Sequence, residues 1–309
     1  MKKLFFLFAC AGISYANAQD FCHPHKSVAP IRMDNAHNIT IKGDSINGGD
    51  QICLDLRNCH DIRITNCWFG NSTHVGVYLY NCANIRVDNC YVTNVASGVY
   101  AVGSYAISVT NCEGKNMVGP FPRGQFVQFN NVSGPRCRIS DNRFENILGQ
   151  SNPEDAINIY KSNGALNDPI LISGNKIRGG GPSKSGGGIM LGDNGGSYIV
   201  AKDNILVNVG QYGMAIAGGD HIRVIDNTIY SKRQDFTNVG VYVWAQANAA
   251  CSFDEVHGNH VNWTKKDGTK NHKWNGANCG DVKGWDDNEM NANIDESILP
   301  KQLLSPCHR

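Results

Sequence analysis

A period-two pattern of apolar and polar residues recurs along most of the chain. Five-residue phrases place apolar side chains at the first and third positions, which is typical of a strand with one buried face. The phrases are LDLRN (54–58), VYLYN (77–81), VYAVG (99–103), VQFNN (127–131), INIYK (157–161), IMLGD (189–193), MAIAG (214–218) and VYVWA (241–245).

A second phrase alternates with the first and ends in asparagine. CHDIRITNCWF (59–69) returns as CANIRVDNCYV (82–92), shifted by 23 residues, and a short third strand follows each asparagine. Because Asn tolerates the left-handed conformation and bonds to backbone groups, it suits a fixed corner. We expect Asn89 to lie in a buried corner, stacked between Asn66 and Asn111. The later copies end at Asn142, Asn175, Asn204, Asn227 and Asn259.

Three short strands per repeat, with no helical pattern, predict an all-β, single-domain parallel β-helix of about eight to nine coils. A β-propeller has a longer repeat, and an antiparallel sandwich needs no matched corner residue. The irregular segment 262–309 is expected to cap the open end of the coils in 19–261, because exposed strand edges must be covered.

The N-terminal segment 1–18 has the three parts of a secretory signal: Lys2 and Lys3, an apolar run, and a small-residue cleavage site at Ala16–Ala18. We therefore expect a secreted or periplasmic protein with no membrane span, and a monomer. The formal net charge of +1 argues against nucleic acid as a partner.

The 12 cysteines of an exported protein suggest disulfides, but the repeat offers another explanation. Cys59 and Cys82 form one file, and Cys67, Cys90 and Cys112 another, so we expect reduced cysteines packed as small apolar residues. Some pairing among Cys251, Cys279 and Cys307 would tie down the end of the chain.

The outward positions of the first phrase carry aromatic and amide side chains where a solvated sheet would carry more Lys, Glu and Thr. Aromatic rings and amides suit sugar rings, so we expect a glycan-binding face. Its residues are Tyr78, Tyr80, Tyr100, Gln128, Asn130, Asn158, Tyr160, Tyr242 and Trp244.

Basic residues are expected to border this face near its middle. Lys161 follows Tyr160 directly, and the long loops before the strands should bring in Arg178, Lys184, Lys232 and Arg233. Such convergence in a near-neutral protein predicts an anionic ligand, and an extended acidic polysaccharide is the natural candidate.

The coils from Asn38 to Asn259 resemble the pectate-lyase-type right-handed β-helix superfamily. More narrowly, NPEDAINIYKSNG (152–164) and GNKIRGGGPSKSGGGIMLGDNGG (174–196) are similar to polysaccharide lyase family 31, whose members are alginate lyases. The resemblance implies right-handed coils and a substrate groove on the outer face of one sheet. It does not identify catalytic residues by motif.

A uronate lyase neutralises the substrate carboxylate, removes the C5 proton and protonates the departing O4. We expect Tyr160, Lys161, Lys184 and Arg178 to supply this chemistry, with Asn158 and Gln128 at the carboxylate. No cofactor is required by the sequence, although hard oxygen ligands for calcium lie near the predicted groove: Glu154, Asp155, Asp193, Asn194 and Asp220.

Two other functions stay open. A glycoside hydrolase needs two carboxyl groups facing the scissile bond, and Asp155, Asp193 and Asp220 could provide them. A non-catalytic glycan-binding protein would keep the aromatic residues and need neither Lys161 nor Lys184.

Overall fold

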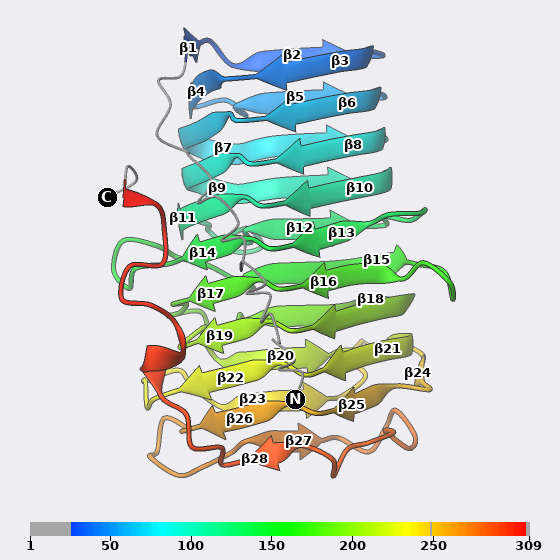
Figure 1. Ribbon diagram of the computed structural model, residues 1–309, viewed down its shortest axis with the longest axis vertical. Coiled ribbons are helices and arrows are strands. Elements are labelled where there is room, and N and C mark those ends of the chain that lie inside the picture. Colours follow the sequence, from blue (N-terminus) through cyan, green and yellow to red (C-terminus); the bar gives the residue numbers. More distant parts are fainter. Residues whose placement is uncertain (1–25, 248, 307–309) are drawn as a thin grey trace, which may run out of the picture.

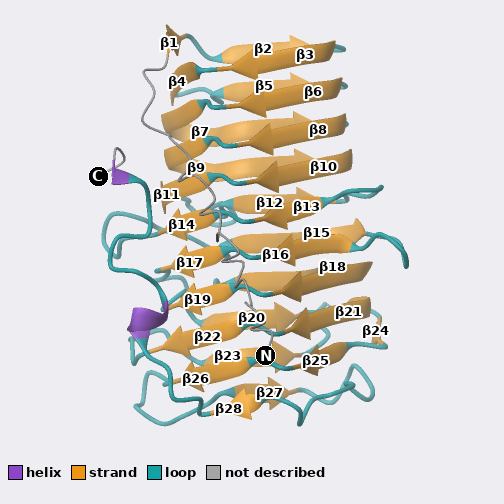
Figure 2. Ribbon diagram, in the orientation of Figure 1, coloured by secondary structure: helices purple, strands orange, loops and turns teal. Residues whose placement is uncertain are grey.

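The chain winds into a right-handed parallel β-helix, described by a computed structural model over residues 26–247 and 249–306 (Figure 1). The coils stack along one long axis, and every strand pairing between coils is parallel. Strands dominate the described residues, and a short 3-10 helix, Glu296–Ile298, lies in the tail (Figure 2). None of the described helices is long and apolar enough to cross a bilayer. The predicted signal segment lies outside the described residues.

Three parallel β-sheets run the length of the stacked coils. The first, which we call the groove sheet, contains the five-residue phrases, and its pairing puts Leu54, Val77, Val99 and Val127 in one buried column. Its strands are β2 (Ile31–Asp34), β5 (Leu54–Arg57), the C-terminal parts of β7 (Trp68–Tyr80) and β9 (Tyr91–Val102), β12 (Val127–Asn130), β15 (Ile157–Asn163), the N-terminal part of β18 (Ile189–Lys202), β20 (Tyr212–Ile216), β23 (Val239–Val243) and β27 (Lys273–Asn275).

The second sheet follows the groove sheet in each coil, and the third sheet completes the turn. The second contains β3 (His37–Lys42), β6 (His60–Thr65), β8 (Ala83–Asp88), β10 (Tyr105–Thr110), β13 (Arg138–Ser140), β16 (Ile170–Ser173), the end of β18, β21 (Gly219–Ile225), β24 (Cys251–Ser252) and β25 (Glu255–His257). The third contains β1 (Lys26–Val28), β4 (Asp44–Gly49), the starts of β7 and β9, β11 (Glu113–Met117), β14 (Arg143–Glu145), β17 (Lys176–Arg178), β19 (Ile205–Val207), β22 (Thr228–Ser231), β26 (His260–Trp263) and β28 (Glu289–Met290).

A buried asparagine ladder occupies the corner between the second and third sheets. The Nδ2 of Asn175 donates to Oδ1 of Asn204 at 2.8 Å, and Asn204 repeats this bond to Asn227 at 2.9 Å. The backbone N–H of each residue donates to the same oxygen. The ladder therefore satisfies buried backbone donors as well as the amides themselves. Its members are Asn142, Asn175, Asn204, Asn227, Asn259 and Asn288.

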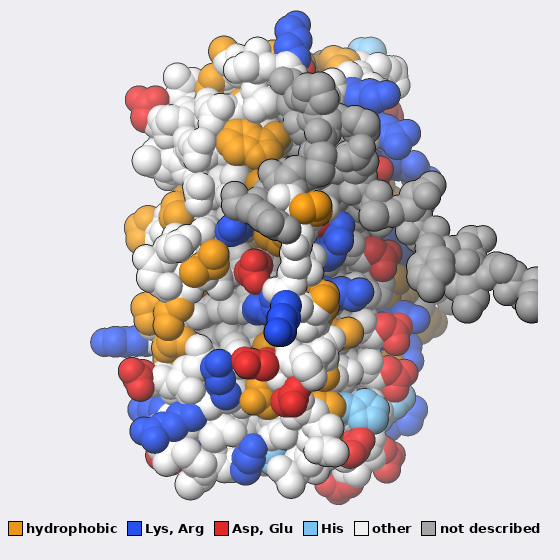
Figure 3. Space-filling view, turned by 60° about the vertical axis from the view of Figure 1, so that its left-hand side comes forward, with side chains coloured by type: hydrophobic (Ala, Val, Ile, Leu, Met, Phe, Trp, Pro, Cys, Tyr) orange, Lys and Arg blue, Asp and Glu red, His pale blue; other side chains and the backbone are white. Residues whose placement is uncertain are grey.

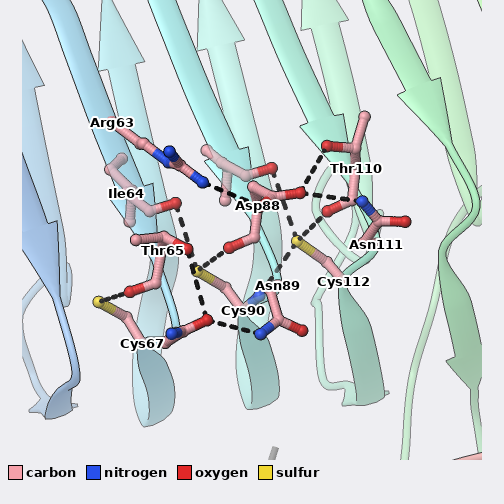
Figure 4. Close-up of polar contacts among 12 residues, drawn as sticks. Arg63, Ile64, Thr65, Cys67, Asp88, Asn89, Cys90, Thr110, Asn111 and Cys112 are labelled. Atoms are coloured by element: carbon pink, nitrogen blue, oxygen red, sulfur yellow. Dashed lines mark hydrogen bonds and ion pairs between the residues drawn. The ribbon is translucent and has the colours of Figure 1, made fainter. Parts of the chain in front are cut away.

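The expected alignment of this corner is wrong by one residue. Cys112 N–H donates to Oδ1 of Asn142 at 2.9 Å, so the ladder continues the cysteine file and not the file of Asn66, Asn89 and Asn111. Those three asparagines occupy the preceding position, where φ is between 53° and 54°. Asn89 is only half-buried; it donates to Asn66 at 2.5 Å, but Asn111 donates to Asp88 instead (Figure 4).

The cysteine files are confirmed as reduced and buried. Cys67, Cys90 and Cys112 occupy equivalent positions of successive coils and direct their thiols at backbone carbonyls (Figure 4). Burial raises the pKa of Cys82 to about 11, which keeps its thiol neutral. Cys251 and Cys279 form a disulfide, as the expected stapling of the chain end requires, and Cys307 lies outside the described residues.

The C-terminal segment differs from the expected cap. β27 adds a further strand beyond β23, and β28 pairs with β26, so the coils continue past residue 261. The tail then runs back along the flank of the third sheet towards the middle of the molecule (Figure 1). Leu299, Leu303 and Leu304 pack there with Tyr91 and Val207.

Asn175→Leu should lower the free energy of unfolding by about 1–3 kcal/mol or more, because it leaves the buried amide groups of its neighbours without partners. Denaturant titration measures this loss. Lys176→Leu introduces the same side chain at the next, exposed position and should change stability by less than about 0.5 kcal/mol. Equal effects of the two changes would contradict a ladder role.

The described free cysteines should resist thiol reagents in the folded protein and react after denaturation, because their thiols are buried and inaccessible to the reagent. They are Cys53, Cys59, Cys67, Cys82, Cys90, Cys112 and Cys137. Mass mapping that found any of them in a disulfide would count against the packed files.

Candidate functional site

A cavity of about 820 Å³ lies over the central and later coils of the groove sheet. This volume is within the usual range for small-molecule and cofactor pockets. The strands supply its base through Gln128, Asn158, Met190 and Tyr242, each of which occupies the second position of its phrase. Loops before the strands supply the walls, with Phe121, Glu154, Lys184, Asn238 and Asn271.

A β-bulge brings one carboxylate into the groove. Tyr160 pairs with Asp193 and not with Gly192, so Gly192 is an extra residue in its strand. Its φ is 63°, and an added Cβ would lie 1.9 Å from the carbonyl oxygen of Gly218. Strict period-two alternation of the phrase IMLGD would align Gly192 with Tyr160, but the bulge aligns Asp193 with it instead.

Two carboxylates at the base of the cavity share one amide group. The Nδ2 of Asn158 donates to Oδ2 of Asp155 at 2.9 Å and to Oδ2 of Asp193 at 3.0 Å. Asp155 also accepts hydrogen bonds from the Tyr212 hydroxyl and from Gly187 N–H. Burial raises the pKa of Asp155 to about 7 and also raises that of Asp193.

Tyr160 and Lys161 are the last two residues of the phrase INIYK in strand β15. The hydroxyl of Tyr160 accepts a hydrogen bond from Nδ2 of Asn194 at 2.8 Å. Lys161 occupies the corner that asparagine fills in other coils, with φ 46°, and its Nζ is 5.4 Å from the centre of the Tyr160 ring. Its ammonium group therefore lies close to the tyrosine in the groove.

Lys184 reaches the cavity on an anchored loop. Its carbonyl accepts a hydrogen bond from Nε2 of Gln211, and Glu154 accepts the hydroxyls of Ser183 at 2.6 Å and Ser185 at 2.5 Å. The glycine-rich segment is thus fixed on both sides of Lys184. The Lys184 side chain itself is exposed at the rim.

Six predicted residues line this one cavity: Gln128, Asn158, Tyr160, Lys184, Tyr242 and Trp244. The others on the aromatic face lie on the same sheet, in the coil of Gln128 or in the two coils before it. Tyr78 packs against Tyr100 with ring centres 5.7 Å apart and against Tyr80 at 6.4 Å, and Asn130 donates to the Tyr100 hydroxyl at 3.0 Å. The predicted aromatic face is therefore continuous with the cavity.

The expected convergence of basic loop residues is only partly correct. Arg178 ends a strand of the third sheet, where it pairs with Glu145 at 3.1 Å and donates to the carbonyls of Pro300 and Lys301 in the tail. Lys232 pairs with Glu296 at 3.1 Å, also in the tail. On the flank that carries the tail, basic and acidic side chains are interspersed (Figure 3). These two residues bind the tail and do not border the groove.

Arg233 also departs from the expectation, because its Nε donates to the carbonyl oxygen of Lys266 at 2.8 Å and it does not line the cavity. Asp220 does not join the other carboxylates; it lies on the second sheet and contacts Nδ1 of His221 at 2.7 Å. The carboxylate and amide groups near the predicted groove, to none of which a calcium ion was assigned, therefore do not all gather at one point in the described chain. The described trio Cys251, Asp254 and Cys279 includes both disulfide sulfurs, so it offers no thiolate ligands.

Sequence reasoning missed several groove residues. Trp274 lies next to Tyr242 in the register and packs against Trp244 with ring centres 5.9 Å apart. Its phrase, KWN, lacks the apolar first position that marks the other coils. Arg123 lies over the Tyr100 ring at 4.4 Å, and Tyr212 lies beneath Asp155. A loop arginine carries no periodic signal, and the buried tyrosine precedes its five-residue phrase.

Comparison with known proteins agrees with this architecture. Residues 17–114 match the family described as "Right handed beta helix region". The fold is similar to the crystal structure of an alginate lyase from Paenibacillus sp. str. FPU-7, with a TM-score of 0.55 and 15% identity, over 89% of this chain and 95% of that chain. No curated protein sequence matches the chain.

Two more distant likenesses concern other β-helix proteins solved with sugars. The catalytic domain of a GH87 α-1,3-glucanase in complex with tetrasaccharides has a TM-score of 0.43 and 12% identity, over 87% of this chain and 59% of that chain. The tailspike protein of E. coli bacteriophage HK620 in complex with a pentasaccharide has a TM-score of 0.44 and 11% identity, over 88% and 54%.

Gly192→Ala should destabilise the protein by more than the cost of its backbone conformation, because the new Cβ meets the Gly218 carbonyl. Gly43→Ala is the matched control, since Gly43 has φ 74° and nothing within 4 Å of an added Cβ. The control should lose about 1–2 kcal/mol, and Gly192→Ala clearly more, in denaturant titrations. Equal losses would mean that the strand can shift without cost.

Proposed function

We propose that the protein is a polysaccharide lyase that binds an acidic, uronate-containing chain along the groove sheet and cleaves it by β-elimination. Alginate is the proposed substrate. The observation that carries this proposal is the presence of Tyr160 and Lys184 in one cavity that continues an aromatic face. The family 31 resemblance and the likeness to an alginate lyase structure support it.

Cations placed on aromatic rings favour an anionic ligand. Arg57 lies 5.5 Å from the centre of the Tyr78 ring, Arg123 lies 4.4 Å from that of Tyr100, and Lys161 lies over Tyr160. Arg57 is also paired with Asp55 at 3.0 Å. A linear polyanion lying across these coils would therefore meet positive charge at Arg123 and Lys161.

The elimination step assigns different roles to Lys184 and Tyr160. Neutral Lys184 takes the C5 proton, the electrons of the C5–H bond form the C4=C5 double bond, and the C4–O4 bond breaks with its electrons on O4. Tyr160 gives its hydroxyl proton to O4. Because the Tyr160 oxygen accepts a hydrogen bond from Asn194, its own proton is available for this donation.

Secretion through the segment 1–18 is part of the same proposal, because a polysaccharide-degrading enzyme must meet its substrate outside the cytoplasm. We further propose that the enzyme works without a bound cofactor. Both points rest on the sequence.

A glycoside hydrolase is the second candidate, favoured by the pairing of Asp155 and Asp193 through Asn158. Two carboxyl groups at the base of one cavity could act as acid and base. The hydrolase would yield saturated products, whereas the lyase yields an unsaturated sugar that absorbs ultraviolet light.

Tyr160→Phe and Lys184→Ala should each lower the elimination rate on alginate by more than about 100-fold with the fold intact, because each removes a group that transfers a proton. Ultraviolet absorbance of the unsaturated product measures the rate. Lys232→Ala is the control, since Lys232 binds the tail, and it should retain near-normal activity.

Near-normal activity in both groove variants would refute this assignment of the site. Binding of alginate by the unaltered protein without any cleavage would favour a non-catalytic glycan-binding protein. Cleavage to saturated products only would favour the hydrolase.

A further inference from the structure

Arg123 lies over the groove sheet next to one end of the cavity, and its charge is not paired. Its guanidinium carbon is 4.4 Å from the centre of the Tyr100 ring, and within the described part of the chain it forms no ion pair. Arg57 lies over Tyr78 in a similar way, at 5.5 Å, but its Nε is 3.0 Å from Oδ1 of Asp55. Of these two guanidinium groups, that of Arg123 is the one that remains free to bind an anion.

The loop that carries Arg123 is held in place by buried hydrogen bonds. Gly124 N–H donates to Oγ of Ser97 at 2.9 Å, and the Ser97 hydroxyl donates to Oε1 of Gln125 at 3.0 Å. Nε2 of Gln125 donates in turn to the carbonyl oxygen of Pro122 at 3.1 Å. Both Ser97 and Gln125 are buried. Because the backbone on either side of the arginine is fixed, less conformational freedom is lost when the side chain binds a ligand.

Gln128 is a buried amide without a partner, in the coil next to Tyr100. The two residues are paired in the register of β9 and β12, so their side chains lie side by side on one face of the sheet. Gln128 is 9% exposed and lines the cavity, and its Oε1 has no hydrogen-bond partner in the described chain. An unpaired buried amide costs stability, and a ligand that carries hydroxyl and carboxylate groups would offset this cost.

The next amide on this face is already occupied. Asn158 pairs with Gln128 in the register, and its Nδ2 donates to Asp155 and to Asp193. Since an amide nitrogen carries two hydrogens, neither remains for a substrate carboxylate, which was the role expected of Asn158. Of the two amides expected to bind a carboxylate, Gln128 is therefore the one that can still donate to it.

We propose that Arg123 and Gln128 form a carboxylate-binding subsite, which takes a uronate that neighbours the reacting sugar in the same chain. The fork of N–H groups on a guanidinium matches the two oxygens of a carboxylate. The amide of Gln128 can donate a further bond to the carboxylate and accept one from a sugar hydroxyl. This inference rests on the proposed lyase function.

The position of the subsite excludes the reacting sugar itself. Tyr160 lies one coil beyond Gln128 and two coils beyond Tyr100, which corresponds to about 10 Å along the axis between the two tyrosine coils. The carboxylate of the reacting uronate is bonded to C5, the carbon that loses its proton. It must therefore lie beside the groups that transfer protons, and Arg123 must bind a different carboxylate of the chain.

A subsite for a sugar that does not react contributes equally to binding of the substrate and of the transition state. Its loss should therefore raise KM and leave kcat near normal. The subsite also gives the groove a preference for chains in which a second uronate lies at a fixed distance from the bond that breaks.

Arg123→Gln removes the charge and keeps a stem that can pack on Tyr100. It should weaken binding of an alginate hexasaccharide by about 10- to 100-fold and raise KM to a similar extent, with kcat within about 2-fold of normal. Arg86→Gln is the matched control, because Arg86 is an exposed arginine of β8 on the second sheet. The control removes the same charge and should change the affinity by less than about 2-fold.

Calorimetry in the Tyr160→Phe background measures this binding with cleavage suppressed. The matched ligand is the same hexasaccharide with its carboxyl groups reduced to alcohols, which should bind equally with and without Arg123→Gln. Equal affinities of the Arg123→Gln and Arg86→Gln variants for the acidic ligand, an equal loss with the reduced ligand, or a fall in kcat in place of a rise in KM would each overturn the proposal. If the unaltered protein forms no unsaturated product, the lyase function fails, while calorimetry still tests the subsite.

Gln128→Met tests the second member of the subsite. It should weaken binding of the hexasaccharide by about 5-fold or more, because a hydrogen bond to a charged group is lost. Without ligand it should not lower the free energy of unfolding, since an unpaired buried amide is replaced by an apolar group of similar shape. Denaturant titration measures the second effect. Unchanged affinity, or a clear loss of stability, would show that Gln128 has a structural role and does not bind the substrate.

Discussion

Parallel, in-register stacking of the coils is the constraint on which the rest of the structure depends. Each strand bonds to the same strand of the next coil, so a residue at one position meets its equivalent one coil away. A buried polar group at a corner can then be satisfied by its counterpart, as Asn204 is by Asn175 and Asn227, together with a strand carbonyl such as that of Ile172. In the early coils, cysteines occupy this corner, and their buried thiols donate hydrogen bonds to backbone carbonyls. Once the corner residues fix the register, the outward-facing residues of successive coils also align in columns.

Two groove residues differ from the repeat: one replaces the usual corner residue, and the other is an extra residue in its strand. Lys161 replaces the corner asparagine without changing the left-handed backbone, so a charge enters the edge of the groove at little structural cost. Gly192 is an extra residue in its strand, and as a result Asp193 pairs with Tyr160. The second exception requires glycine, because the neighbouring Gly218 carbonyl occupies the space of a Cβ. Both departures lie in the coils that form the cavity.

The sequence was sufficient to predict what repeats. The columns that contain Tyr78, Tyr100, Gln128 and Asn158 follow from period-two alternation, and the structure pairs them as expected. The corner was misjudged by one residue because Asn-Cys in early coils and Asp-Asn or Gly-Asn in later ones share an asparagine, although at different positions. Arg178 was misplaced because a loop's length does not reveal which sheet its first residue belongs to. The course of the tail depends on Leu299 and Leu303, whose spacing has no counterpart in the coils.

Carboxylates and cations occupy different parts of the groove sheet. Asp155 and Asp193 lie at the base of the cavity, where both accept hydrogen bonds from Asn158, and no described basic side chain pairs with them. Arg123 and Lys161 lie over aromatic rings, whereas Arg57, over Tyr78, is already paired with Asp55 at 3.0 Å. Under the proposed function, the cations over the rings would attract a polyanion from a distance, and interactions that strengthen only as charge develops on the substrate would lower the barrier. Binding and catalysis would then fall to different parts of one groove, as a surface requires that must hold a long chain and act on one bond of it.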